Sequence, residues 1–141
     1  MLEESFYWAI EDVIGGSEKP RSKKELEWLF EKGIRAIVSL SENPLSEESI
    51  ESFPFEYIHL PIANLTTPSL KQVKDFIRWT SFMERVKKPI LVHCTAGYGR
   101  TGMLLSIFLL KKGYKAKKAI DFIRSKKSGS IETQKQEEFI Y

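Results

Sequence analysis

Apolar residues occur in this chain both as short continuous runs and at the three-to-four-residue spacing of helices. The short runs, bounded by polar or turn residues, predict strands at 6–10, 12–16, 34–40, 55–60 and 90–93. Helical spacing, with Ser, Thr or Gly at the ends, predicts helices at 22–32, 69–82, 103–112, 116–125 and 133–141, and a helical turn near 46–48. Strands that alternate with helices indicate a three-layer α/β fold, with a mostly parallel central sheet flanked by helices.

The gross properties of the chain narrow the class of protein. Its 141 residues are expected to form a single domain, residues 1–141, because this length supports one hydrophobic core. The longest largely apolar stretch, 103–110, is too short to span a bilayer, so we expect no membrane partner. A single cysteine and an acidic start without signal-peptide features favour a cytoplasmic protein. His59 and His93 are the only histidines, and no metal-ligand spacing occurs, so we expect neither metal nor cofactor.

Charge is unevenly distributed along the chain. Residues 1–56 hold thirteen acidic and six basic side chains, whereas residues 87–127 hold eleven basic side chains and only Asp121 as an acid. A positive field over the second segment would attract anionic substrates, although most of these lysines can equally be explained as solvated helix faces. Aromatic residues are not interleaved with the basic ones, so we expect no nucleic-acid partner.

The candidate chemistry lies in residues 93–102, which read His-Cys-Thr-Ala-Gly-Tyr-Gly-Arg-Thr-Gly and contain the only cysteine, Cys94. A predicted strand ends and a predicted helix begins around this segment. Helix N-termini present backbone N–H groups and a positive dipole end, which bind anions and favour a thiolate. Arg100 adds a planar fork of donors that suits phosphate. A buried structural cysteine would not need an arginine six residues later, so the segment indicates a nucleophile beside a phosphate cradle.

These residues match the Cys-x₅-Arg loop of the protein tyrosine phosphatase superfamily, and the chain resembles its small dual-specificity members of atypical and archaeal type. Further segments carry this resemblance, at 6–8 with 14–16, 33–40, 60–62 with 68–70, and 129–133 with Gln136 and Glu137. The resemblance implies a phosphatase-like fold and an enzyme that hydrolyses phosphotyrosine, and also phosphoserine or phosphothreonine, through a phosphocysteine intermediate.

A role for each residue of the loop follows from the resemblance and from the chemistry. Cys94 would attack phosphorus, and Arg100 would stabilise the charge that builds on the phosphate. The resemblance makes Thr101 a donor to the sulfur and His93 a residue that organises the loop. Backbone N–H groups would hold the phosphate oxygens, from Thr95, Ala96, Gly97, Tyr98, Gly99 and Arg100.

One position departs from the family pattern. Relatives carry an aspartate two residues after Pro-Ile as the general acid, but this chain has Asn64 there, and an amide cannot release a proton at neutral pH. Loss of a general acid typically costs ~10²–10⁴ in rate. The enzyme is therefore slow, uses a substrate with a good leaving group, uses another acid, or carries an asparagine introduced to trap a complex. Glu132 is the nearest substitute by resemblance, but it can equally be read as a carboxylate favoured by a helix dipole.

Three functions remain open at this point. The first is a protein phosphatase, whose partners are phosphorylated proteins and whose Cys94 loop would bind phosphate or oxyanion inhibitors. The second is a phosphoanhydride hydrolase such as an RNA 5′-triphosphatase, whose leaving group would not need an acid at Asn64. The third is a weakly active form that binds phosphate or traps substrate. We expect a monomer in each case.

Overall fold

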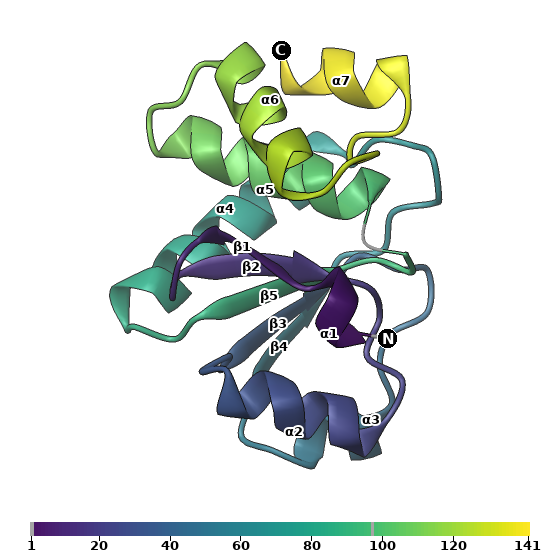
Figure 1. Cartoon of the computed structure of the whole chain (residues 1–141), viewed down its shortest axis with the longest axis vertical. Helices are drawn as coiled ribbons and strands as arrows, with labels where there is room; N and C mark the ends of the chain where they lie inside the picture. The colour runs from purple at the N-terminus through teal and green to yellow at the C-terminus, as the bar shows by residue number, and fades with distance from the viewer. Residues whose placement is uncertain (1, 97) are drawn as a thin grey trace.

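Five strands form one central sheet with helices on both faces in the computed structural model, which describes residues 2–96 and 98–141 (Figure 1). The strand order is β1-β2-β5-β3-β4. β1 (Tyr7–Ile10) pairs antiparallel with β2 (Ile14–Ser17), and all other pairs are parallel. The remaining strands are β3 (Ala36–Ser39), β4 (Glu56–His59) and β5 (Ile90–His93). The predicted α/β fold with a mostly parallel sheet is confirmed.

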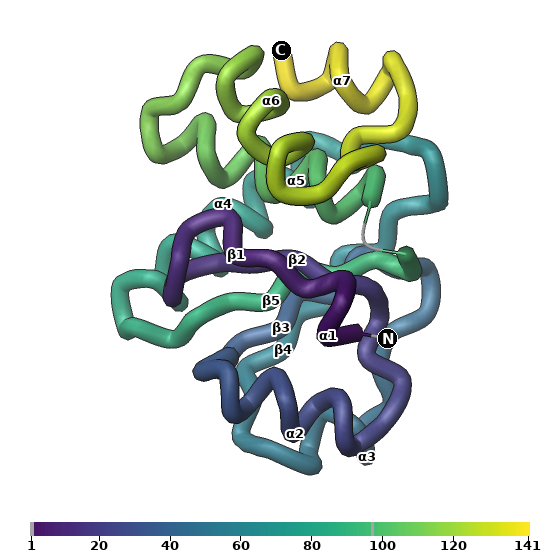
Figure 2. Tube along the Cα trace, in the orientation of Figure 1, coloured from purple at the N-terminus to yellow at the C-terminus, as the bar shows by residue number. Residues whose placement is uncertain are grey.

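The helices divide into two layers, which the trace in Figure 2 separates clearly. One face of the sheet carries α4 (Leu70–Arg85), α5 (Gly99–Lys111), α6 (Ala116–Lys126) and α7 (Gln134–Ile140). The other face carries α1 (Leu2–Ser5), α2 (Lys23–Glu31) and α3 (Glu47–Glu51). A larger apolar cluster that includes Phe76 and Phe108 fills the first layer, and a smaller one that includes Leu26 and Leu29 fills the second.

Local signals in the sequence explain where most helices begin. The hydroxyls of Ser22, Ser69 and Thr133 each accept a hydrogen bond from the backbone N–H three residues later, as N-cap residues do. α5 begins at Gly99, four residues before the predicted start, because the end of the Cys94 motif is itself helical. The short helix α1 was not expected from the pattern of apolar residues.

Parallel strands place their carboxyl ends at one edge of the sheet. Ser39 and His93 are paired across β3 and β5, so the segments that follow these strands meet there. α5 packs closely on β2, because Gly16 has no side chain: a Cβ at this position would lie 2.7 Å from Cγ2 of Thr101. The fold therefore brings the start of α5 and the residues after β3, β4 and β5 to one place.

Candidate active site

Cys94 directly follows β5 and is buried, with only 2% of its surface exposed. The Thr101 hydroxyl, in the first turn of α5, donates a hydrogen bond to the Cys94 sulfur over 3.0 Å. The sulfur thus lies between the end of a central strand and the N-terminus of a buried helix. This is the position in which a helix dipole and a hydroxyl donor both stabilise negative charge on sulfur.

The Arg100 guanidinium is buried and binds three partners around the loop. Nη1 donates to the Ile62 carbonyl over 2.8 Å and to Oε1 of Glu42 over 2.9 Å, and Nη2 lies 3.3 Å from the Thr95 hydroxyl. These contacts fix the guanidinium plane beside the segment that starts at Cys94. They also tie the segment after β4 to the start of α5, and the two run side by side in Figure 2.

Glu42 is a site residue that the sequence analysis missed. Its side chain is 59% exposed, and its hydrogen bond from Arg100 is the main reason why the pKa of its carboxyl is lowered. A smaller contribution comes from the backbone N–H of Asn64. The signal that could have found it is its position: it lies just after a predicted strand, where polar residues of an α/β sheet gather around ligands.

His93 anchors the start of the Cys94 loop from the buried end of β5. It is fully buried, its Nδ1 lies 3.2 Å from the Cys94 carbonyl, and its Nε2 lies 2.5 Å from the Ser39 hydroxyl. Burial lowers the pKa of His93 to about 4, so the ring is neutral at pH 7. Because a carbonyl can only accept, Nδ1 carries the proton and Nε2 accepts from Ser39. His93 therefore holds the Cys94 backbone and does not act as a charged group.

Asn64 lies on an exposed turn between β4 and α4, next to the carboxylate of Glu42. Two residues earlier, the Ile62 carbonyl binds Arg100, so the turn borders the Cys94 loop. The next acid along the chain, Asp75, is on α4 and pairs with Lys71 over 3.0 Å. The structure therefore brings Asn64 to the site and leaves Asp75 in a surface ion pair.

Glu132 reaches the loop from the segment that precedes α7. Its Oε1 accepts from the backbone N–H of Gly99 over 3.2 Å. Gly99 allows this approach, since a Cβ there would lie 2.8 Å from Oε1 of Glu132. The buried Gln136 holds Glu132 in turn, because its Oε1 accepts from the Glu132 backbone N–H while its Nε2 donates to the Thr66 carbonyl. Glu132 thus contacts the first N–H of α5.

The other predicted phosphate-binding residues line a recess beside the loop. Thr95, Ala96 and Tyr98 border a cavity of about 470 Å³, together with charged side chains that include Arg21 and Lys127. The Lys127 ammonium lies 5.0 Å from the centre of the Tyr98 ring. Gly97, which was also predicted to bind phosphate, lies outside the described residues.

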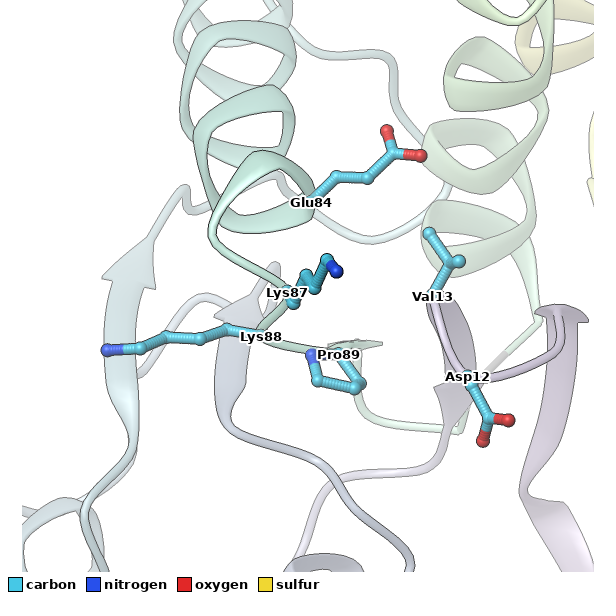
Figure 3. Close-up of a pocket in the computed structure, with 6 residues that line it drawn as sticks. All are labelled: Asp12, Val13, Glu84, Lys87, Lys88 and Pro89. Atoms are coloured by element: carbon cyan, nitrogen blue, oxygen red, sulfur yellow. The ribbon is translucent and has the colours of Figure 1, made fainter.

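A second recess, of about 220 Å³, lies at the opposite end of β5 (Figure 3). Two of the charged residues that line it have partners elsewhere: Lys88 pairs with Glu56, and Glu84 pairs with Lys112. In Figure 3 the Lys88 ammonium and the Asp12 carboxylate point in different directions. The described residues that line this recess include no cysteine, serine, threonine or histidine, so the candidate active site is the one at Cys94.

Comparison with known families bears directly on this site. Residues 3–140 match the family described as the Swiss Army Knife protein, DSP-PTPase phosphatase domain. The chain belongs to this phosphatase family. The match covers nearly the whole chain and includes every site residue described above, which confirms the resemblance to small dual-specificity phosphatases.

Individual relatives of this phosphatase domain agree with the family. Tyrosine-protein phosphatase cdcA of Emericella nidulans is 34% identical over 111 residues, which are 77% of this chain and 19% of that protein. Human protein tyrosine phosphatase type IVA 3 is 29% identical over 77% of this chain and 64% of its own length. The crystal structure of Tk-PTP in the active form has a TM-score of 0.86 and 30% identity, and covers 95% of this chain and 92% of that one. The chain thus spans less than two thirds of these curated relatives.

Proposed function

We propose that this domain, residues 1–141, hydrolyses phosphotyrosine in proteins by way of a phosphocysteine intermediate. The observation that carries the proposal is the pairing of the Cys94 sulfur with the Thr101 hydroxyl at 3.0 Å, together with the buried guanidinium of Arg100, whose Nη2 lies 3.3 Å from the hydroxyl of the adjacent Thr95. This arrangement supplies a nucleophile, a donor to sulfur and a fixed cation for phosphate oxygens. Membership of the phosphatase family supports the same activity.

The reaction proceeds in two displacements at phosphorus. The Cys94 thiolate forms a bond to phosphorus as the ester P–O bond breaks, and the leaving oxygen departs with a proton or as an anion. Water then attacks phosphorus, the S–P bond breaks, and inorganic phosphate and the thiolate are released. The Thr101 hydroxyl stabilises sulfur as it leaves, and Arg100 stabilises the charge on the phosphate oxygens in both steps.

The missing carboxyl at Asn64 favours aryl over alkyl phosphate esters. The tyrosine hydroxyl has a reference pKa near ~10, so its anion leaves more readily than the alkoxide of serine or threonine. Phosphotyrosine is therefore the main substrate class in this proposal, with phosphoserine and phosphothreonine as slower substrates. The tyrosine phosphatases among the relatives favour this substrate over a phosphoanhydride and over a substrate-trapping form.

Glu42 is proposed to hold the Arg100 fork in place and to be displaced by the phosphate. Its carboxylate already occupies one donor of the guanidinium, at 2.9 Å. A substrate dianion brings more negative charge to the same fork and can replace this exposed carboxylate at little cost. Glu132, which accepts from the first N–H of α5, would orient this end of the helix or supply the proton that Asn64 cannot.

The cellular compartment, partners and inhibitors that we propose for the enzyme follow from the chemistry of its cysteine nucleophile. A single reactive cysteine needs a reducing compartment, which supports a cytoplasmic location for this proposal. Within the part of the chain that the structure describes, no helix is both long and apolar enough to cross a bilayer. Phosphorylated proteins are the expected partners, and phosphate, vanadate and similar oxyanions are the expected inhibitors of a monomeric enzyme.

The proposal is tested by turnover of p-nitrophenyl phosphate and of a phosphotyrosine peptide. Cys94→Ser should abolish hydrolysis but retain phosphate binding, because Arg100 and the backbone remain. Arg100→Lys should lower kcat/KM by ~10²–10³, since a point charge does not reproduce the planar fork. Arg78→Lys, on α4, is the matched control and should behave as the parent. Hydrolysis by Cys94→Ser at near the parent rate would show that Cys94 is not the nucleophile.

A further inference from the structure

A groove of about 520 Å³ lies beside the active site, between the turn that carries Asn64 and helix α7. Six residues line it: Leu65, Thr66, Thr67, Lys135, Glu138 and Phe139. Its size is in the range of pockets that accept a side chain or small ligand. Apolar surface from Leu65 and Phe139 faces it, with charged groups of α7 at its border.

Leu65 has a backbone conformation that a leucine disfavours. The Thr66 N–H donates to the Ala63 carbonyl over 3.1 Å, which closes a four-residue turn, and Leu65 occupies the third position with φ of 66°. Glycine or asparagine is usual where a turn demands positive φ at this position. Ile131 also has positive φ but buries its side chain to 2% exposure, whereas Leu65 remains 51% exposed. Packing within the domain does not account for a leucine at this site.

The groove is linked to the phosphate site through the turn on one side and through α7 on the other. The Ile62 carbonyl binds Arg100, and the Asn64 backbone N–H lies at the Glu42 carboxylate that shares this guanidinium. The buried Gln136 of α7 bridges the two sides: it binds the Thr66 carbonyl and the backbone N–H of Glu132, whose side chain contacts Gly99. A peptide whose phosphate lies at Arg100 would therefore have a neighbouring residue at this groove.

We infer that the groove is a substrate subsite that binds an apolar side chain flanking the phosphorylated residue. This inference rests on the proposed phosphatase function and adds a sequence preference to it. Leu65 supplies the apolar wall, and its unfavourable φ is retained because the side chain contacts substrate. Apolar discrimination of this kind amounts to about tenfold or more in kcat/KM.

The test uses pairs of phosphotyrosine peptides that differ at one flanking position, which is either leucine or aspartate. The parent should prefer leucine by about tenfold at one or more of these positions. Leu65→Asn should reduce that ratio to near one, and it should not lower the melting temperature, because asparagine tolerates positive φ. Leu70→Asn is the matched control: this leucine is 73% exposed at the start of α4, outside the groove, and its replacement should leave the ratio unchanged.

Each contrary result has a distinct meaning. Hydrolysis of all peptides with no preference for leucine, or an equal loss in both variants, would overturn the subsite. A dimeric parent that becomes monomeric with Leu65→Asn, at an unchanged peptide ratio, would assign the groove to self-association and also overturn it. Absence of turnover on every phosphopeptide and on p-nitrophenyl phosphate would instead overturn the proposed function itself.

Discussion

At the carboxyl end of β5, polar side chains are buried and each is hydrogen-bonded within the site, whereas at its amino end charged side chains reach the surface and pair there. The buried set comprises Ser39, His93, Arg100 and Thr101, each with at most 3% of its surface exposed. The surface pairs are Lys88 with Glu56 and Lys112 with Glu84. The two ends of one strand therefore satisfy their polar groups differently: by buried hydrogen bonds at the carboxyl end and by surface ion pairs at the amino end.

The cost of burying polar groups explains this difference between the two ends. A buried polar group costs roughly 1–3 kcal/mol if it lacks a hydrogen-bond partner, so each one at the carboxyl end needs a specific neighbour. Apolar residues would stabilise the sheet edge with fewer constraints. A reaction at Cys94 requires polar side chains at the carboxyl end of β5. The amino end has no reaction to support, so its charged side chains need only keep the surface soluble.

The largest effect should come from adding a proton donor to the carboxyl end. Asn64→Asp should raise hydrolysis of alkyl phosphates and phosphoserine peptides by ~10²–10⁴, because their leaving oxygens need a proton. p-Nitrophenyl phosphate should gain little. The Glu42 carboxylate nearby would disfavour ionisation of the introduced group, and the rate should fall at alkaline pH once that group ionises. Steady-state rates against leaving-group basicity and pH measure both effects.

The alternatives for this position give different patterns. An equal gain on all substrates would mean that position 64 orients the substrate and donates no proton. No gain with Asn64→Asp, together with a large loss with Glu132→Gln, would assign the acid to Glu132. Gln134→Glu, on the exposed side of α7, is a control for the added charge and should leave the rate unchanged.

Acid should destabilise the carboxyl end through His93. Its pKa is about 4 in the folded protein and ~6.5 in an unfolded chain, so between these values only the unfolded state gains a proton. The free energy of unfolding should therefore fall by about 3 kcal/mol as pH drops from 6.5 to 4, and this contribution should be fully present above pH 6.5. Urea unfolding across this pH range measures the decrease.

Two histidine variants identify the source of that decrease. His93→Gln should flatten the pH dependence of stability between 6.5 and 4, even where the variant is less stable overall. His59→Gln should retain the parent's dependence, since the His59 ring lies at the Ser41 carbonyl, outside the buried pair of His93 and Ser39. A parent whose stability is constant over this range would contradict a buried neutral His93.

The sequence allowed the fold and the centre of the site to be predicted because their signals are local. Ser22, Ser69 and Thr133 mark helix starts within one turn, and the Cys94 motif places nucleophile and arginine six residues apart. Glu42 has a weaker local signal, its position just after a predicted strand, which does not reveal its partner. Its contact with Arg100 spans 58 residues and depends on β3 lying next to β5.

The groove was equally hidden in the sequence. The bond between Gln136 and Thr66 joins residues 70 positions apart, and leucine gives no indication that the backbone at position 65 has positive φ. Propensity would place glycine or asparagine there. The contact between Gln136 and Thr66 and the leucine at position 65 both depend on the assembled site. Neither can be inferred from the neighbouring residues in the chain.

Removal of the Glu42 charge should have a moderate effect. Glu42→Gln keeps an oxygen that can accept from Arg100 but removes the anion that competes with phosphate. The inhibition constant of inorganic phosphate should therefore fall a few-fold. Isothermal titration or competitive inhibition measures it. Weaker phosphate binding in Glu42→Gln would mean that the charge is needed to hold Arg100 in position.

The smallest effect should come from the amino end of β5. Lys88→Met retains the aliphatic part of the side chain and removes the ion pair with Glu56. The side chains of Lys88 and Glu56 are 41% and 49% exposed, respectively. Exposed pairs contribute about 0–1 kcal/mol, so the melting temperature should change little and kcat/KM should equal that of the parent. A double-mutant cycle with Glu56→Gln isolates the pair's own contribution. A change in kcat/KM of several-fold at unchanged stability would show that the two ends of β5 are coupled, and the contrast between a surface end and a catalytic end would then fail.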